Sequence, residues 1–225
     1  MKNLFGLLTL LFIVAFSFAQ EKMEAPKISK SSNLGNTRMV LDLTLDNWLN
    51  TPDSIKNNII KSRGVNIYSM YEIPFGSSNF SFVFGIGFGS NNISNNAKII
   101  YSGDTLTLFE PIATSYKVNK ISLNYVDVPL EIRFKTKADA QNQSFKFAVG
   151  FKGGYLVNSH TKYKDSGGKI KIYDIKNLSP YRYGASVRIG YGWFALTGYY
   201  SVSTLFVKDK GPDVILWSAG ISINP

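Results

Sequence analysis

The sequence contains no cysteine, which excludes disulfide bonds, thiolate chemistry and attachment to a membrane through a lipidated cysteine. His160 is the only histidine, and no group of histidine and acidic residues has the spacing of metal ligands. No apolar run reaches 18 residues, so no transmembrane helix is expected. The glycine-rich run at residues 85–89 is not followed by a helix that could receive a phosphate. We therefore predict no catalytic residues, no metal or cofactor site, and no enzymatic activity.

The first residues have the pattern of a secretory signal. Lys2 supplies a positive charge, residues 4–16 form an apolar segment, and Ala19 is a small residue before the expected cleavage position. An uncleaved membrane anchor is the alternative, but the apolar segment is too short for one and lacks a charged flank. We expect a signal peptide at residues 1–19 and a polar periplasmic tail at residues 20–36.

The chain is basic, with a formal net charge of +10. A basic balance can indicate a nucleic-acid partner. The chain is expected to be exported and has no basic helix or recognisable nucleic-acid motif, so no nucleic-acid partner is expected. Contact with anionic lipid headgroups is the preferred explanation of the charge.

Residues 79–89 alternate between large apolar and small side chains. Phe80, Phe82, Phe84, Ile86 and Phe88 share one face, and the other face carries mostly glycine and serine. A water-soluble strand would usually carry charged side chains on that second face. This pattern is typical of a transmembrane β-strand with bulky side chains toward lipid.

Similar alternation recurs along the chain and predicts eight strands. They are expected at about residues 37–47, 63–74, 79–89, 120–136, 144–157, 181–190, 193–205 and 214–223. The connections are alternately long and short, as in outer-membrane barrels with long extracellular loops and short periplasmic turns. The predicted fold class is all-β: an eight-stranded antiparallel up-and-down transmembrane β-barrel over residues 37–225, located in the cell outer membrane.

A secreted lipocalin-like barrel is the rival architecture, with its apolar face inside. Glycines at 150, 154, 184 and 190 share a face with charged side chains, as a narrow, crowded lumen requires and a water-facing surface does not. Aromatic residues near the strand ends are expected to form the girdles of a membrane barrel. They are Trp48, Phe75, Tyr125, Phe134, Phe145, Tyr155, Tyr181, Tyr191 and Trp193.

Three segments resemble a known family. Tyr125–Phe134 (YVDVPLEIRF), Phe147–Tyr155 (FAVGFKGGY) and Gly220–Ile223 (GISI) are similar to strands of the outer-membrane β-barrel family that is typical of Bacteroidetes and includes PorT. The resemblance implies a barrel in the outer membrane. It also implies an alternative role, because PorT is a component of the type IX secretion system: an accessory subunit of a secretion or transport complex.

The predicted lumen face carries charges of both signs. A charge in a narrow interior needs a partner, so we predict an ion-pair network that closes the lumen. An ion-conducting pore, the alternative, would favour a lining of one sign. The predicted network comprises Asp42, Glu72, Asp127, Glu131, Arg133, Lys152, Arg182 and Arg188, and Asp46, Lys135 and Lys146 are expected on the same face.

The connection at residues 158–180 is rich in lysine. Alternating isoleucines at 170, 172 and 175 suggest that strands extend above the membrane here. The lysines either form a solvated loop or contact an anionic partner such as lipopolysaccharide phosphates; a protein partner is also possible at the long loops. The candidate residues are Lys162, Lys164, Lys169, Lys171 and Lys176.

His160 lies at the start of this connection, directly after Ser159. Some outer-membrane lipid A deacylases are eight-stranded barrels with a His–Ser pair, but their His-x-Ser spacing is missing here. A solvated surface histidine is therefore expected. The function predicted from the sequence is a structural or surface-interaction role through the long loops.

Overall fold

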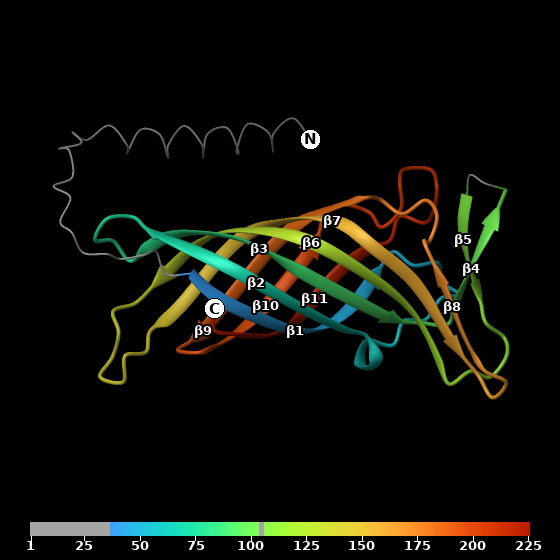
Figure 1. Cartoon of the computed structure of the whole chain (residues 1–225), viewed down its shortest axis with the longest axis horizontal. Helices are drawn as coiled ribbons and strands as arrows, with labels where there is room; N and C mark the ends of the chain where they lie inside the picture. Colours follow the sequence, from blue (N-terminus) through green and yellow to red (C-terminus); the bar gives the residue numbers. More distant parts are fainter. Residues whose placement is uncertain (1–36, 104–105) are drawn as a thin grey trace. The chain divides into compact units, whose positions relative to one another are not determined.

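The computed structural model describes residues 37–103 and 106–225, and the predicted signal peptide and periplasmic tail lie outside these residues. Eight antiparallel strands form a closed barrel in which each strand pairs with the next along the chain and β11 pairs with β1, which confirms the predicted fold class (Figure 1). The barrel strands are β1 (Thr37–Leu49), β2 (Arg63–Pro74), β3 (Phe80–Ser94), β6 (Val118–Lys135), β7 (Phe145–Lys164), β9 (Tyr181–Tyr191), β10 (Phe194–Ser201) and β11 (Ile215–Ile223).

The two ends of the barrel differ in their connections. Short turns join β2 to β3, β6 to β7 and β9 to β10, and β11 ends at the same end; we call this the turn end. At the opposite end, the loop end, the connections contain the 3-10 helix η1 (Ile59–Lys61), the hairpin of β4 (Ala97–Ser102) and β5 (Leu106–Pro111), and β8 (Lys169–Tyr173) (Figure 1). Among the described residues, no helix is long and apolar enough to cross a membrane.

Several strands at the loop end run further than the sequence indicated. β7 continues to Lys164 rather than ending near residue 157, because β6 on one side and β8 on the other supply hydrogen-bonding partners. The strand extension predicted around residues 170–175 is confirmed as β8. β10 is shorter than predicted and ends at Ser201. The Ser201 hydroxyl donates a hydrogen bond to the Ser203 carbonyl, which stabilises a turn directly after the strand.

The outside of the barrel is apolar along most of its length. On β3, Phe80, Phe84, Ile86 and Phe88 are exposed, with Phe88 reaching 68%. On β7, the outward-facing residues are likewise apolar and exposed as far as Val157. Beyond Val157, the outward-facing residues of β7 are polar. A continuous apolar exterior of this kind is unfavourable in water and is what a lipid-facing wall requires.

Small residues make room for charged groups inside. A Cβ on Gly89 would lie 2.6 Å from Asp127 Oδ2 and 2.7 Å from Arg182 Nη2, both closer than real Cβ atoms come to other groups. Glycine at this position therefore allows the Asp127–Arg182 pair to fit within the barrel. This is the crowding that the glycines on the lumen face predicted.

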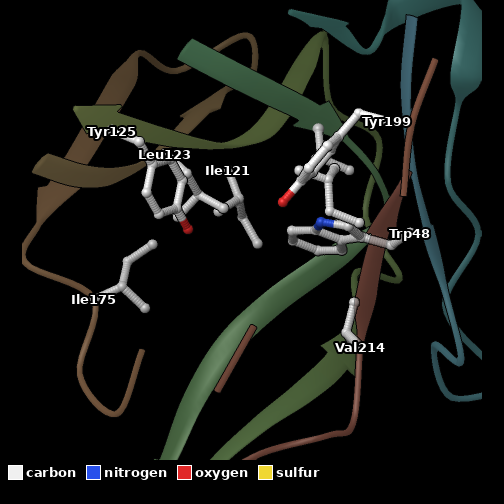
Figure 2. Packing of buried hydrophobic residues seen from close by; sticks show 9 residues of the cluster. Trp48, Ile121, Leu123, Tyr125, Ile175, Tyr199 and Val214 are labelled. Carbon is white, nitrogen blue, oxygen red and sulfur yellow. The ribbon is translucent and has the colours of Figure 1, made fainter. Parts of the chain in front are cut away.

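An apolar cluster closes the loop end of the lumen. Trp48, Tyr125 and Tyr199 are buried there together with Ile121, Leu123 and Val214 (Figure 2). The Trp48 ring stacks on Phe109 of β5, with ring centroids 5.8 Å apart. Trp48 and Tyr125 were expected in the lipid-facing girdles, and that expectation was wrong: both follow the inward alternation of β1 and β6, and their exposed fractions are 2% and 4%.

Candidate functional sites in the lumen and at the loop end

The structure places all eight residues of the predicted network in the interior, where they form three consecutive groups. In the group nearest the loop end, Arg182 of β9 holds Asp127 of β6 with two hydrogen bonds of 3.1 and 2.6 Å. The Arg182 guanidinium lies 3.8 Å from the Tyr125 ring centroid. Lys152 Nζ is 3.9 Å from Asp127 Oδ2 and 4.0 Å from the Tyr199 ring centroid. The two tyrosines thus take part in a site that the charge pattern alone did not reveal.

The middle group joins three strands through one arginine. Arg188 of β9 donates to Asp42 of β1 at 2.6 Å and also to Glu131 of β6. The neighbouring cavity, lined by Asp42, Glu131 and Arg188 among others, has a volume of about 20 Å³. A space of that size holds about one water molecule. Side chains therefore fill this part of the lumen.

The third group lies closest to the turn end. Arg133 contacts Glu131 at 3.2 Å and Glu72 at 3.6 Å, and Lys135 pairs with the same Glu72. The Ser81 hydroxyl donates to Glu72 at 2.7 Å. Arg133 and Glu131 thereby link this group to the middle one.

Two of the other charged residues expected on the lumen face are buried without an ionic partner in these groups. Asp46 accepts hydrogen bonds from the Thr44 hydroxyl and the Asn91 amide, both at 2.7 Å. Lys146 donates to the backbone carbonyl of Gly192 and to a backbone oxygen of Pro225, the last residue of the sequence. Both are 8% exposed or less.

The lysine-rich connection forms a sheet extension with a cationic face. Lys120 of β6, Lys162 of β7 and Lys171 of β8 are direct neighbours across the three strands, and we call them the lysine row. Lys164 and Lys169 are the next pair along. Within the described parts of the chain, none of these five lysines forms an ion pair with a carboxylate. Side chains directly opposite in antiparallel strands are within about 5.5 Å at Cβ, so like charges there are destabilising.

The charges of the lysine row affect one another. Burial lowers the pKa of Lys120, and the nearby positive charges of Lys162 and Lys171 lower it further. Lys120 Nζ donates to Asn92 Oδ1 at 2.8 Å. Lys176, the fifth candidate from the sequence, lies beyond β8, with its Nζ 5.8 Å from the Tyr101 ring centroid. The structure therefore brings Lys162, Lys164, Lys169 and Lys171 together on β7 and β8, adds Lys120, and leaves Lys176 outside the group.

His160 is a strand residue of β7 and is partly buried, which corrects the expectation of a solvated loop histidine. Its ring centroid lies 5.4 Å from that of Tyr173. Burial lowers its pKa, and the positive charges of Lys171, Lys120 and Lys162 add to that effect. Ser159 occupies the other face of the strand, where its hydroxyl accepts from the Ile175 amide. The two side chains therefore do not form a hydroxyl–imidazole pair.

The opposite face of the extension is apolar. Ile170, Ile172 and Tyr163 face Ile99 and Ile112 from the β4–β5 region across a cavity of about 370 Å³. Sequence alternation showed the isoleucines, but not the hairpin that lies against them. In residues 37–103 and 106–225, no group of three or more His, Cys, Asp or Glu side chains could hold a metal ion.

Comparison with known proteins identifies the type of domain. A family model described as "Outer membrane protein beta-barrel domain" matches residues 18–206. That span includes barrel strands β1 to β10. No curated protein matches the chain.

Proposed function

Because the chain belongs to the outer membrane protein β-barrel domain family, we propose that it is a small barrel with a side-chain-filled lumen that binds an anionic partner at the cell surface. The partner's chemistry is that of the phosphate groups of lipopolysaccharide. The proposal includes no catalytic activity, since domains of this family are typically not enzymatic.

The lysine row is the observation that carries the proposal. Three neighbouring strands place a lysine at the same level, and no carboxylate of the described residues forms an ion pair with any of the three. Such a row costs folding free energy, through like-charge repulsion that is largest for close, partly desolvated groups. A bound phosphate removes the repulsion and accepts charge-assisted hydrogen bonds from several ammonium groups.

Asp165 does not neutralise the row. Its carboxylate accepts hydrogen bonds from the backbone amides of Gly167 and Gly168 and so shapes the turn between β7 and β8. Ile170 and Ile172 form an apolar surface on the opposite face of the same extension. An amphipathic molecule with phosphate and acyl groups matches both faces.

The test measures binding of lipopolysaccharide by the full chain in zwitterionic micelles. Changing Lys120, Lys162 and Lys171 together to glutamine should weaken binding by about tenfold or more, since each charged hydrogen bond contributes roughly 1.5–3 kcal/mol. The matched control changes Lys56, Lys61 and Lys208 to glutamine, which removes the same charge from exposed positions at the loop end. If both variants weakened lipopolysaccharide binding equally, binding would depend on overall charge rather than on the lysine row, and the proposed site would be refuted.

The resemblance of Tyr125–Phe134 in β6 to PorT-like strands supports a second candidate, an accessory subunit of a secretion or transport complex in Bacteroidetes. Co-purification from detergent-solubilised membranes tests it. The lysine-row variant should lose lipopolysaccharide binding. If that variant still co-purifies with secretion components, the result favours this second role. Recovery of lipopolysaccharide alone by the unaltered chain favours the first.

A further inference from the structure

The turn end of the lumen contains a cavity of about 470 Å³ with a strongly basic lining. Three cations from three strands line it: Arg38 of β1, Lys135 of β6 and Lys146 of β7. No acidic side chain is among its lining residues in the described part of the chain. This cavity is separate from the lysine row, which lies at the loop end.

The charge of this end is not balanced by the lumen network. Lys135 pairs with Glu72 alone among the described carboxylates, and the same Glu72 oxygen also lies 3.6 Å from Arg133. Lys146 donates to the Gly192 carbonyl at 2.8 Å and to a backbone oxygen of Pro225, the last residue of the sequence, at 2.7 Å. Arg38 forms no ion pair with any described residue. Among the described residues, five buried carboxylates stand against five buried cations, and the half-buried Arg38 and Lys135 add two further cations at the turn end.

The remaining lining groups suit an oxyanion. Asn142, Gln143 and Asn224 bring amide groups, and Thr136 and Ser144 bring hydroxyls. Arginine presents parallel N–H donors that match the oxygens of a phosphate, and lysine adds a mobile point charge. The volume falls within the range of small-molecule sites, about 300–1,000 Å³. A phosphate monoester carries a charge of about −1.5 to −2 at pH 7, which the three lining cations can offset.

We propose that the turn-end cavity binds a phosphate group, with Arg38, Lys135 and Lys146 as its charged ligands. Phosphate chemistry can come from a soluble phosphate monoester or from a phospholipid headgroup. The second source fits Trp193, which lines the cavity and is 64% exposed, in the way expected of an aromatic residue at a membrane surface.

Titration calorimetry with glycerol phosphate tests the soluble source, using the full chain in non-ionic micelles. The lysine-row variant K120Q/K162Q/K171Q serves as the background, so that binding at the loop end does not contribute. Arg38→Gln in this background should weaken binding by about tenfold or more. The matched control is Lys137→Gln, which removes one charge from an exposed position in the neighbouring β6–β7 turn and should change the affinity less than twofold.

Native mass spectrometry tests the lipid source. The same proteins are released from nanodiscs of phosphatidylcholine with and without phosphatidylglycerol, and the retained lipid is counted. Retention of phosphatidylglycerol that is lost in R38Q/K146Q but kept in K137Q supports a headgroup site. Failure of both probes to bind, or equal behaviour of the Arg38→Gln and Lys137→Gln variants, would overturn the proposal. Heat-dependent gel mobility confirms that each variant is folded.

Discussion

Replacing Arg188 with alanine leaves two buried carboxylates without their shared cation. Arg188 is 6% exposed, and Asp42 and Glu131, its partners, are 3% and 2% exposed. Asp42 has no other ion pair in the described structure, whereas Glu131 keeps Arg133 at 3.2 Å. Breaking a buried pair by removing one partner costs about 3–5 kcal/mol, because the remaining charge stays desolvated. With Asp42 fully deprived of a cation, we expect Arg188→Ala to fall within that range.

The assay is reversible urea unfolding of the barrel in lipid vesicles, followed by tryptophan fluorescence and by heat-dependent gel mobility. The matched control is Arg63→Ala, since Arg63 is an exposed arginine at the start of β2. Surface substitutions of this kind change stability by about 0.5 kcal/mol or less. Adding Asp42→Asn to Arg188→Ala should recover part of the loss, because the second change removes the unpaired carboxylate.

A loss below about 1 kcal/mol for Arg188→Ala would refute the reasoning, as that is the range of a solvated ion pair. It would mean that water reaches the middle of the lumen and screens Asp42. The same result would also weaken the case for a lumen that side chains fill.

Three further predictions concern the whole barrel and its loop end. The unheated protein should migrate anomalously on SDS gels and fractionate with the outer membrane, because its closed hydrogen-bonded sheet resists detergent; recovery as a soluble periplasmic protein would contradict the membrane barrel. Planar-bilayer recordings should show no steady large conductance, because side chains fill the lumen, and a stable open channel would favour a porin. Anion binding at the lysine row should weaken as the pH rises through the pKa of Lys120, which burial and neighbouring lysines lower from 10.5; Lys120→Gln should remove that part of the pH profile, and an unchanged profile would exclude Lys120 from the site.

The sequence by itself determined the eight barrel strands and the direction of their faces, although not their ends at the loop end or the β4–β5 hairpin. β2 was predicted at its observed residues, because its alternation is regular and bounded by polar connections at both ends. The same alternation placed Asp42, Asp127 and Arg188 inside. The same alternation also predicts an inward side chain for Trp48, which lies two residues after Asp46 and six after Asp42. Trp48 was assigned to the lipid-facing girdle because it lies near the strand end, although its place in the alternation indicates the lumen face.

Only the tertiary structure decided which groups meet. Arg188 and Asp42 lie 146 residues apart, and their contact depends on how far each strand is shifted relative to its neighbours around the closed barrel. The pairing of β6 with β7 changes register at Asn124 and Tyr125, which turns Ser159 inward and aligns Lys120 with Lys162. The turn-end cavity likewise brings Arg38 of β1 next to Lys135 and Lys146 of β6 and β7, which are distant from β1 in sequence. Alternation is a local property with a period of two residues, whereas strand register and shear are properties of the whole closed sheet.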